Sequence, residues 1–157
     1  MARPRRLPAW TYRLIGIVGR SRFVTRLHPT VYRLTEGRGP IGRVLGLQMV
    51  VLTTTGRRSG QPRDAPLFTL RDGSTFLLVG THGGEETLPD WVANLRATPD
   101  ATVQVARERL AVRAREPEPG GEEYRALWTR AVAAYPGYAA YRARRSTDPP
   151  IVVLEPR

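Results

Sequence analysis

Between residues 49 and 154, apolar and polar positions alternate in short runs with the period of a β-strand. Six segments have this character or are rich in β-branched residues, and we expect each to form a strand: 49–55, 65–70, 75–80, 101–106, 109–115 and 151–154. Asp72-Gly73 lies between the second and third segments and predicts a hairpin turn. Short connections between successive strands favour an antiparallel sheet.

One segment near the C-terminus has a helical period instead. Its apolar positions fall on one stripe, at Tyr124, Leu127, Trp128, Ala131, Val132 and Tyr135. This stripe predicts a helix that packs against the sheet. Pro136 ends that helix and can begin a second one.

Three further helices are expected. Thr87 stands three residues before Asp90, which is the capping-box spacing, so a short helix should open at residues 87–90, with Pro89 in its first turn, and stop near Thr98-Pro99. Segments 9–18 and 22–34 predict two amphipathic N-terminal helices, and a glycine-rich connector follows at 36–40.

These elements predict an α+β fold. The chain has no regular βαβ alternation, which disfavours a Rossmann fold, and a small antiparallel barrel whose openings are covered by helices fits best. The 157 residues suffice for one domain with a real core. We divide the chain into a basic, amphipathic helical segment at 1–43 and a barrel domain that binds a cofactor at 44–157.

Charge and composition exclude several classes of function. All 25 basic residues are arginine, and residues 1–43 hold ten of them against one acid, Glu36, so +9 of the net +11 lies there. The surplus indicates an anionic partner, whereas the nearly balanced remainder disfavours a nucleic-acid-binding module. The chain has no cysteine and only His28 and His82 as imidazoles, so we expect no metal site. No apolar run approaches the roughly 20 residues of a membrane span, and we expect a cytoplasmic protein, with peripheral attachment to the inner face of the membrane left open.

The stretch TTTGRRSGQPRDAP, residues 53–66, concentrates positive charge between two glycines. Gly56 and Gly60 allow the backbone to approach a ligand, and Arg57, Arg58 and Arg63 carry the forked donors that suit phosphate or carboxylate. The stretch therefore predicts an anion seat. A solvated hairpin turn is the alternative.

Two more segments have candidate chemistry. Gly83 and Gly84 follow a strand in GTHGG, where His82 could donate to an anion or a carbonyl, unless the segment is simply a solvated loop. Tyr135, Tyr138 and Tyr141 in AYPGYAAY offer a flat apolar wall with hydroxyl donors, or else a packing edge.

Taken in order, the motifs LTTTGRRSGQPR…PL, LRDG, GG…PDW…NL…TP, YPGYAAY and IVVLEP resemble the deazaflavin (coenzyme F-420)-dependent nitroreductase family over about residues 30–156. The resemblance implies a split β-barrel, similar to FMN-binding barrels. It also implies hydride transfer from reduced F-420 to a nitroaromatic, quinone or activated enone.

The same resemblance implies roles for individual residues. It places Tyr135, Tyr138 and Tyr141 in the substrate pocket, and we expect Tyr135 and Tyr138 to be the catalytic residues, one or other of which hydrogen-bonds the acceptor as charge builds on it. The cofactor-binding residues that it implies are Arg57, Arg58, Gly60, Arg63, Pro66, Phe68, Thr81, His82, Gly83, Gly84, Trp91 and Asn94. His82 stands where the family usually has lysine, which removes a fixed charge.

Alternatives to this function remain open. A split barrel can bind a cofactor or a lipid without turnover, and FMN is a rival cofactor. The oligomeric state is open as well, with a dimer among the options.

The N-terminal segment generates a first testable prediction. Its apolar residues Trp10, Leu14 and Ile17 lie among arginines, which suits either an anionic bilayer or packing on the barrel. If it binds a bilayer, the full chain will co-sediment with anionic vesicles and a chain lacking residues 1–26 will not, while neutral vesicles serve as the control. Co-sedimentation that survives the deletion would remove the membrane interpretation.

Overall fold

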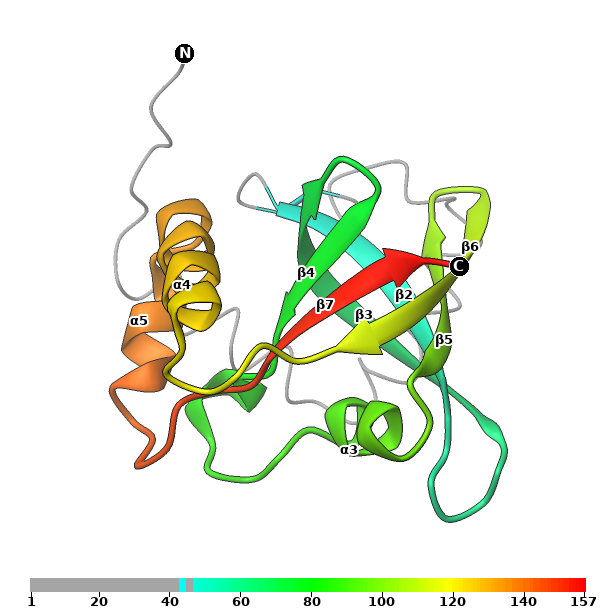
Figure 1. Cartoon of the computed structure of the whole chain (residues 1–157), viewed down its shortest axis with the longest axis horizontal. Helices are drawn as coiled ribbons and strands as arrows, with labels where there is room; N and C mark the ends of the chain where they lie inside the picture. Colours follow the sequence, from blue (N-terminus) through cyan, green and yellow to red (C-terminus); the bar gives the residue numbers. More distant parts are fainter. Residues whose placement is uncertain (1–42, 45–46) are drawn as a thin grey trace.

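The strands close into a barrel with helices at its side and end (Figure 1). The computed structural model describes residues 43–44 and 47–157. Its strands are β1 (Arg43–Val44), β2 (Leu47–Thr55), β3 (Pro62–Asp72), β4 (Thr75–Val79), β5 (Asp100–Val105), β6 (Glu108–Arg115) and β7 (Ile151–Pro156). All six expected strands are therefore present. The helices expected at 9–18 and 22–34 and the connector at 36–40 lie outside the described residues.

Antiparallel pairing continues around the whole sheet. The strand order is β1-β2-β3-β4-β7-β6-β5, and β5 pairs again with β2, with Val51 opposite Gln104 and Leu52 opposite Val103. This second pairing closes β2 to β7 into a barrel and leaves none of these strands with a long free edge. The prediction of an antiparallel barrel is confirmed. The expected hairpin at Asp72-Gly73 is also confirmed, because Asp72 pairs with Thr75 and Gly73 has a φ of 58°.

Alternate residues of the strands fill the barrel interior. The fully buried set comprises Val50, Leu52, Phe76, Leu78, Val103, Val112, Val152 and Leu154, and Trp91, Val92 and Leu95 of α3 (Asp90–Ala97) join the same cluster. Each such side chain contributes about 1.5–3 kcal/mol through burial. The interior is a packed core, so a ligand must bind elsewhere.

The two C-terminal helices cover the outside of the barrel. α4 (Glu122–Ala134) and α5 (Gly137–Arg142) pack Tyr124, Ala131 and Tyr138 against outward residues of β4 and β7 (Figure 1). The Tyr124 hydroxyl donates to the Pro149 carbonyl at 2.8 Å, and burial raises the pKa of Tyr124 to about 12. The predicted apolar stripe and the break at Pro136 are confirmed.

The predicted capping box is wrong. α3 begins at Asp90 with Pro89 at its N-cap and without a side-chain cap. The Thr87 hydroxyl instead lies 2.8 Å from Nδ1 of His82, in the 3₁₀ turn η1 (His82–Gly84), and 3.4 Å from a Glu85 carboxylate oxygen. Pro89 has the extended ψ of an N-cap residue, 139°, so the helix starts only at Asp90 and Thr87 lies two residues before the N-cap.

None of the helices in the described part of the chain has both the length and the apolar character needed to cross a bilayer.

Candidate functional site

A cleft of about 1160 Å³ lies between the β2–β3 loop, β3, η1, α3 and the junction of α4 with α5. Its volume is ample for a cofactor-sized ligand. Most of the residues that the sequence singled out line it: Arg57, Arg58, Arg63, Pro66, Phe68, Thr81, His82, Gly83, Trp91, Asn94, Tyr135, Tyr138 and Tyr141. Gly60 and Gly84 lie outside the lining.

The β2–β3 loop, residues 56–61, closes on itself. The Gly56 amide donates to the Gln61 carbonyl at 2.8 Å, and the Gly60 amide donates to the Gly56 carbonyl at 2.7 Å. Gly60 has a φ of 66°, the left-handed region that glycine adopts at little cost. Gly60 therefore shapes the turn and has no side chain to offer a ligand.

Asn94 of α3 ties this loop to the barrel. Its Oδ1 accepts from the Arg57 amide at 3.1 Å and from Arg57 Nη1 at 3.2 Å, and its Nδ2 donates to the Thr54 hydroxyl at 3.1 Å. Asn94 and Thr54 are only 4% and 2% exposed. When such a buried group loses its hydrogen-bond partner, the free energy of unfolding falls by about 1–3 kcal/mol.

Arg57 also pairs with Asp90, which lies one helical turn before Asn94. Arg57 Nη1 lies 2.9 Å from Asp90 Oδ1, but the Asp90 side chain is 87% exposed. An ion pair so open to solvent contributes about 0–1 kcal/mol. The buried amide of Asn94 therefore does more than Asp90 to hold Arg57 on α3.

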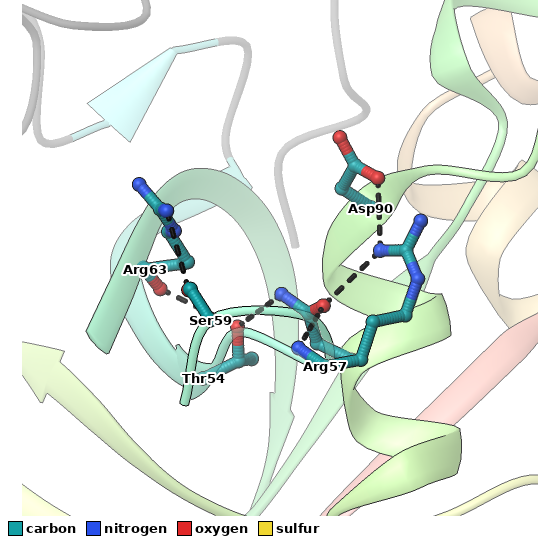
Figure 2. Close-up of polar contacts among 6 residues, drawn as sticks. Thr54, Arg57, Ser59, Arg63 and Asp90 are labelled. Atoms are coloured by element: carbon teal, nitrogen blue, oxygen red, sulfur yellow. Dashed lines mark hydrogen bonds and ion pairs between the residues drawn. The ribbon is translucent and has the colours of Figure 1, made fainter. Parts of the chain in front are cut away.

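Arg58 and Arg63 differ from Arg57. Arg58 is exposed and has no hydrogen bond or ion pair with any other residue that the structure describes. Arg63 Nη2 donates to the Ser59 hydroxyl at 3.3 Å, which leaves most of its donors available (Figure 2). The loop thus presents two available guanidinium groups to the cleft.

The turn η1 forms a second wall. His82, Gly83 and Gly84 follow one another with φ of 48°, 67° and 90°. A Cβ on Gly84 would lie 3.2 Å from the Tyr141 carbonyl oxygen, so Gly84 allows the turn to pack against α5. This packing explains why Gly84 does not face the cleft.

Two buried hydroxyls face the cleft without a partner. Thr81 and Tyr138 are each 6% exposed, both line the cleft, and neither hydroxyl makes a hydrogen bond within the described residues. Burial, and then Tyr141, raises the pKa of Tyr138, so its hydroxyl stays protonated and can donate. A ligand with acceptor oxygens would satisfy both groups.

The other two tyrosines satisfy each other. The hydroxyls of Tyr135 and Tyr141 lie 3.2 Å apart, and the Tyr135 ring packs edge-on against Tyr138 with centroids 5.0 Å apart. The Tyr135 ring also lies over Gly137, where a Cβ would come 2.4 Å from Cζ. Gly137 therefore permits the arrangement of all three rings.

Together these walls define the ligand that the cleft can take. The lining includes arginines of the β2–β3 loop, the apolar side chains of Pro66, Phe68 and Trp91, and the hydroxyl donors of Thr81 and Tyr138. An elongated molecule with an anionic tail and a flat body that carries oxygens fits this set of groups. Thr54 and Asp90 were missed by sequence reasoning, although the spacing of Asp90 and Asn94 on one helical face was a signal for the second.

Comparisons with known proteins agree with this geometry. A family model described as F420H(2)-dependent quinone reductase matches residues 24–156. An F420H(2)-dependent quinone reductase from Mycobacterium tuberculosis is 36% identical over 151 residues, which cover 94% of this chain and 97% of the relative.

Solved structures give the same result. One described as an F420-H2 dependent reductase (FDR-A) is 36% identical, with a TM-score of 0.62 over 68% of this chain and 93% of its own. Another, described as a domain-swapped dimer, is 33% identical, with a TM-score of 0.65 over 86% of this chain and 100% of its own.

The contact between Tyr135 and Gly137 is directly testable. Gly137→Ala should force the Tyr135 ring aside, lower the free energy of unfolding by about 1–3 kcal/mol and change the near-UV circular dichroism of the tyrosines. In a Tyr135→Leu background the same substitution should cost nothing, because the clashing ring is gone. If Gly137→Ala lowered the free energy of unfolding equally in the wild-type and Tyr135→Leu backgrounds, the contact between Tyr135 and Gly137 would be contradicted.

Proposed function

This chain belongs to the F420H(2)-dependent quinone reductase family, and we propose that it passes a hydride from reduced coenzyme F-420 to a quinone bound beside Tyr138. Nitroaromatics and activated enones are further acceptors under the proposal. The observation that carries it is the buried hydroxyl of Tyr138, which has no hydrogen-bond partner among the described residues and lines the same cleft as Arg58 and Arg63.

The residues present fit the cofactor. F-420 has a phosphate and an acidic tail, which Arg58 and Arg63 would hold, and a flat ring, which Pro66, Phe68 and Trp91 would border. Thr81, whose hydroxyl has no partner in the described part of the chain, would donate to one of its polar atoms. The family is named for F420H(2), so F-420 is preferred to FMN. When bound, the coenzyme supplies the hydride.

The chain's own part in the reaction is positioning and charge stabilisation. A quinone that accepts a hydride becomes a hydroquinone anion, which then takes up one proton. Tyr138 donates a hydrogen bond to the oxygen on which this charge grows, in a site largely screened from water. The Tyr135 hydroxyl already shares a hydrogen bond with Tyr141, in which either group can be the donor, so Tyr138 is the stronger candidate for this task.

Two finer expectations also belong to the proposal. Residues 1–43 would bring the protein to an anionic membrane, where lipophilic quinones are concentrated. A dimer is supported by the similar structure described as a domain-swapped dimer.

The cofactor assignment predicts binding followed by turnover. Oxidised F-420 titrated into the protein should change in fluorescence, and reduced F-420 should then be oxidised when menadione is added. Arg58→Glu should weaken F-420 binding about tenfold or more without lowering the unfolding temperature, since Arg58 has no partner to lose. Arg109→Glu, which reverses an exposed arginine outside the cleft, is the control. If F-420 bound but its reduced form were not oxidised by menadione, the enzymatic proposal would be wrong, and a protein that carries the cofactor would be favoured.

The role of Tyr138 predicts separate effects on turnover and stability. Tyr138→Phe should lower the rate of menadione reduction by about 100-fold and leave F-420 affinity unchanged. Because the raised pKa keeps the hydroxyl protonated, the wild-type rate should show no loss from tyrosine ionisation below about pH 10. The unliganded variant should be no less stable, since an unpaired buried hydroxyl is removed. Tyr135→Phe is the control, and equal turnover in wild type and Tyr138→Phe would contradict the role.

A further inference from the structure

The structure separates two adjacent arginines that have the same chemistry. Arg57 Nη1 donates to Asp90 (Figure 2) and to Asn94 of α3, whereas Arg58 has no partner among the described residues. We propose that Arg57, Asn94 and Thr54 form a latch that positions the 56–61 loop, and that Arg58 is the cation which this latch presents to the anionic ligand.

The latch joins three elements through one buried amide. Asn94 Nδ2 holds the Thr54 hydroxyl at the end of β2, and Asn94 Oδ1 holds the loop through the Arg57 amide and guanidinium. The Thr54 hydroxyl in turn faces the Arg63 carbonyl at the start of β3, at 3.4 Å. Both acceptor sites of Oδ1 are thereby used, so this oxygen serves the loop and not a ligand.

The loop has few other attachments. Its remaining hydrogen bonds among the described residues lie within residues 56–61, apart from the one between Arg63 and Ser59. The contacts of Arg57 are therefore what join the loop to α3. Without them the loop would sample arrangements in which Arg58 points elsewhere.

The physical consequence is preorganisation. When only a fraction of the molecules holds the loop in the binding arrangement, the apparent affinity falls by that fraction. A latch of buried hydrogen bonds keeps this fraction high before any ligand arrives. Arg57 and Asn94 thus strengthen binding through Arg58 and are positioning residues.

The first test needs no ligand. Hydrogen exchange of the unliganded protein should show the amides of 56–61, and that of Arg57 above all, exchanging about fivefold faster in Asn94→Leu, with the β4–β7 amides unchanged. Thr54→Val removes the bond that anchors the Asn94 amide to β2, with little change of volume, and should have the same direction of effect, should Asn94→Leu fold poorly. Arg58→Gln is the matched control and should leave exchange unchanged. Unchanged exchange in both latch variants would overturn the latch.

The second test asks how Arg57 acts, and it rests on the proposed function because its probe is F-420. Arg57→Gln and Asn94→Leu should each weaken F-420 binding about tenfold while the dependence of affinity on ionic strength stays as in wild type. Arg58→Gln should reduce that dependence, since it removes a charge that meets the ligand. In the Arg58→Gln background, Arg57→Gln and Asn94→Leu should each lower F-420 affinity by a smaller factor, because both act through Arg58.

The contrary outcomes are separable. In the first, Arg57→Gln makes F-420 affinity less dependent on ionic strength and lowers it by a factor that adds to that of Arg58→Gln. That result would mean that Arg57 contacts the ligand, and it would overturn the positioning role. Faster exchange with unaltered F-420 affinity would overturn it too. If wild type itself does not bind F-420, the proposed function fails, while the exchange measurement still decides whether the latch exists.

Discussion

The pairing of β2 with β5 is the constraint on which the rest of the structure depends. By placing Leu52 opposite Val103 it closes the sheet, turns alternate side chains into a packed interior and leaves the barrel no long free edge. The same closure fixes the end of β2, where Thr54 lies beneath Asn94 of α3. The loop at residues 56–61 therefore starts from a fixed position at the end of β2.

Against this rigid frame, the cleft holds polar groups whose hydrogen-bonding capacity is not used. The hydroxyls of Thr81 and Tyr138 are buried but have no partner in the described part of the chain, at a cost of about 1–3 kcal/mol each. The barrel core is large enough to offset this cost. Native proteins break the rules of polar satisfaction mainly where a ligand completes them, which is why these two hydroxyls support the assigned function more strongly than the arginines do.

The arginine loop shows how far a site could be predicted from sequence. The residues TTTGRRSGQPR indicated an anion seat, and the arginines do line one cleft. Arg57 and Arg58 could not be told apart, because the difference lies in Asn94, 37 positions further along the chain. Thr87 failed as a helix cap because α3 begins only at Asp90, with Pro89 at its N-cap, and the Thr87 hydroxyl lies beside Nδ1 of His82 instead. Local spacing in the sequence identifies the groups that are able to form hydrogen bonds. Their proximity in the folded structure determines which of these hydrogen bonds form.

The sequence by itself determined the strands, the amphipathic helix ending at Pro136 and the order of motifs that marks the family, because periodicity and turn residues act over a few neighbouring positions. Tertiary structure alone decided which donors are used and which remain for a ligand. The hydroxyls of Tyr135 and Tyr141 lie 3.2 Å apart, while that of Tyr138, between them in the chain, has no partner among the described residues. That outcome depends on the packing of α4 and α5 on the barrel, and no local pattern encodes the distance between two hydroxyls.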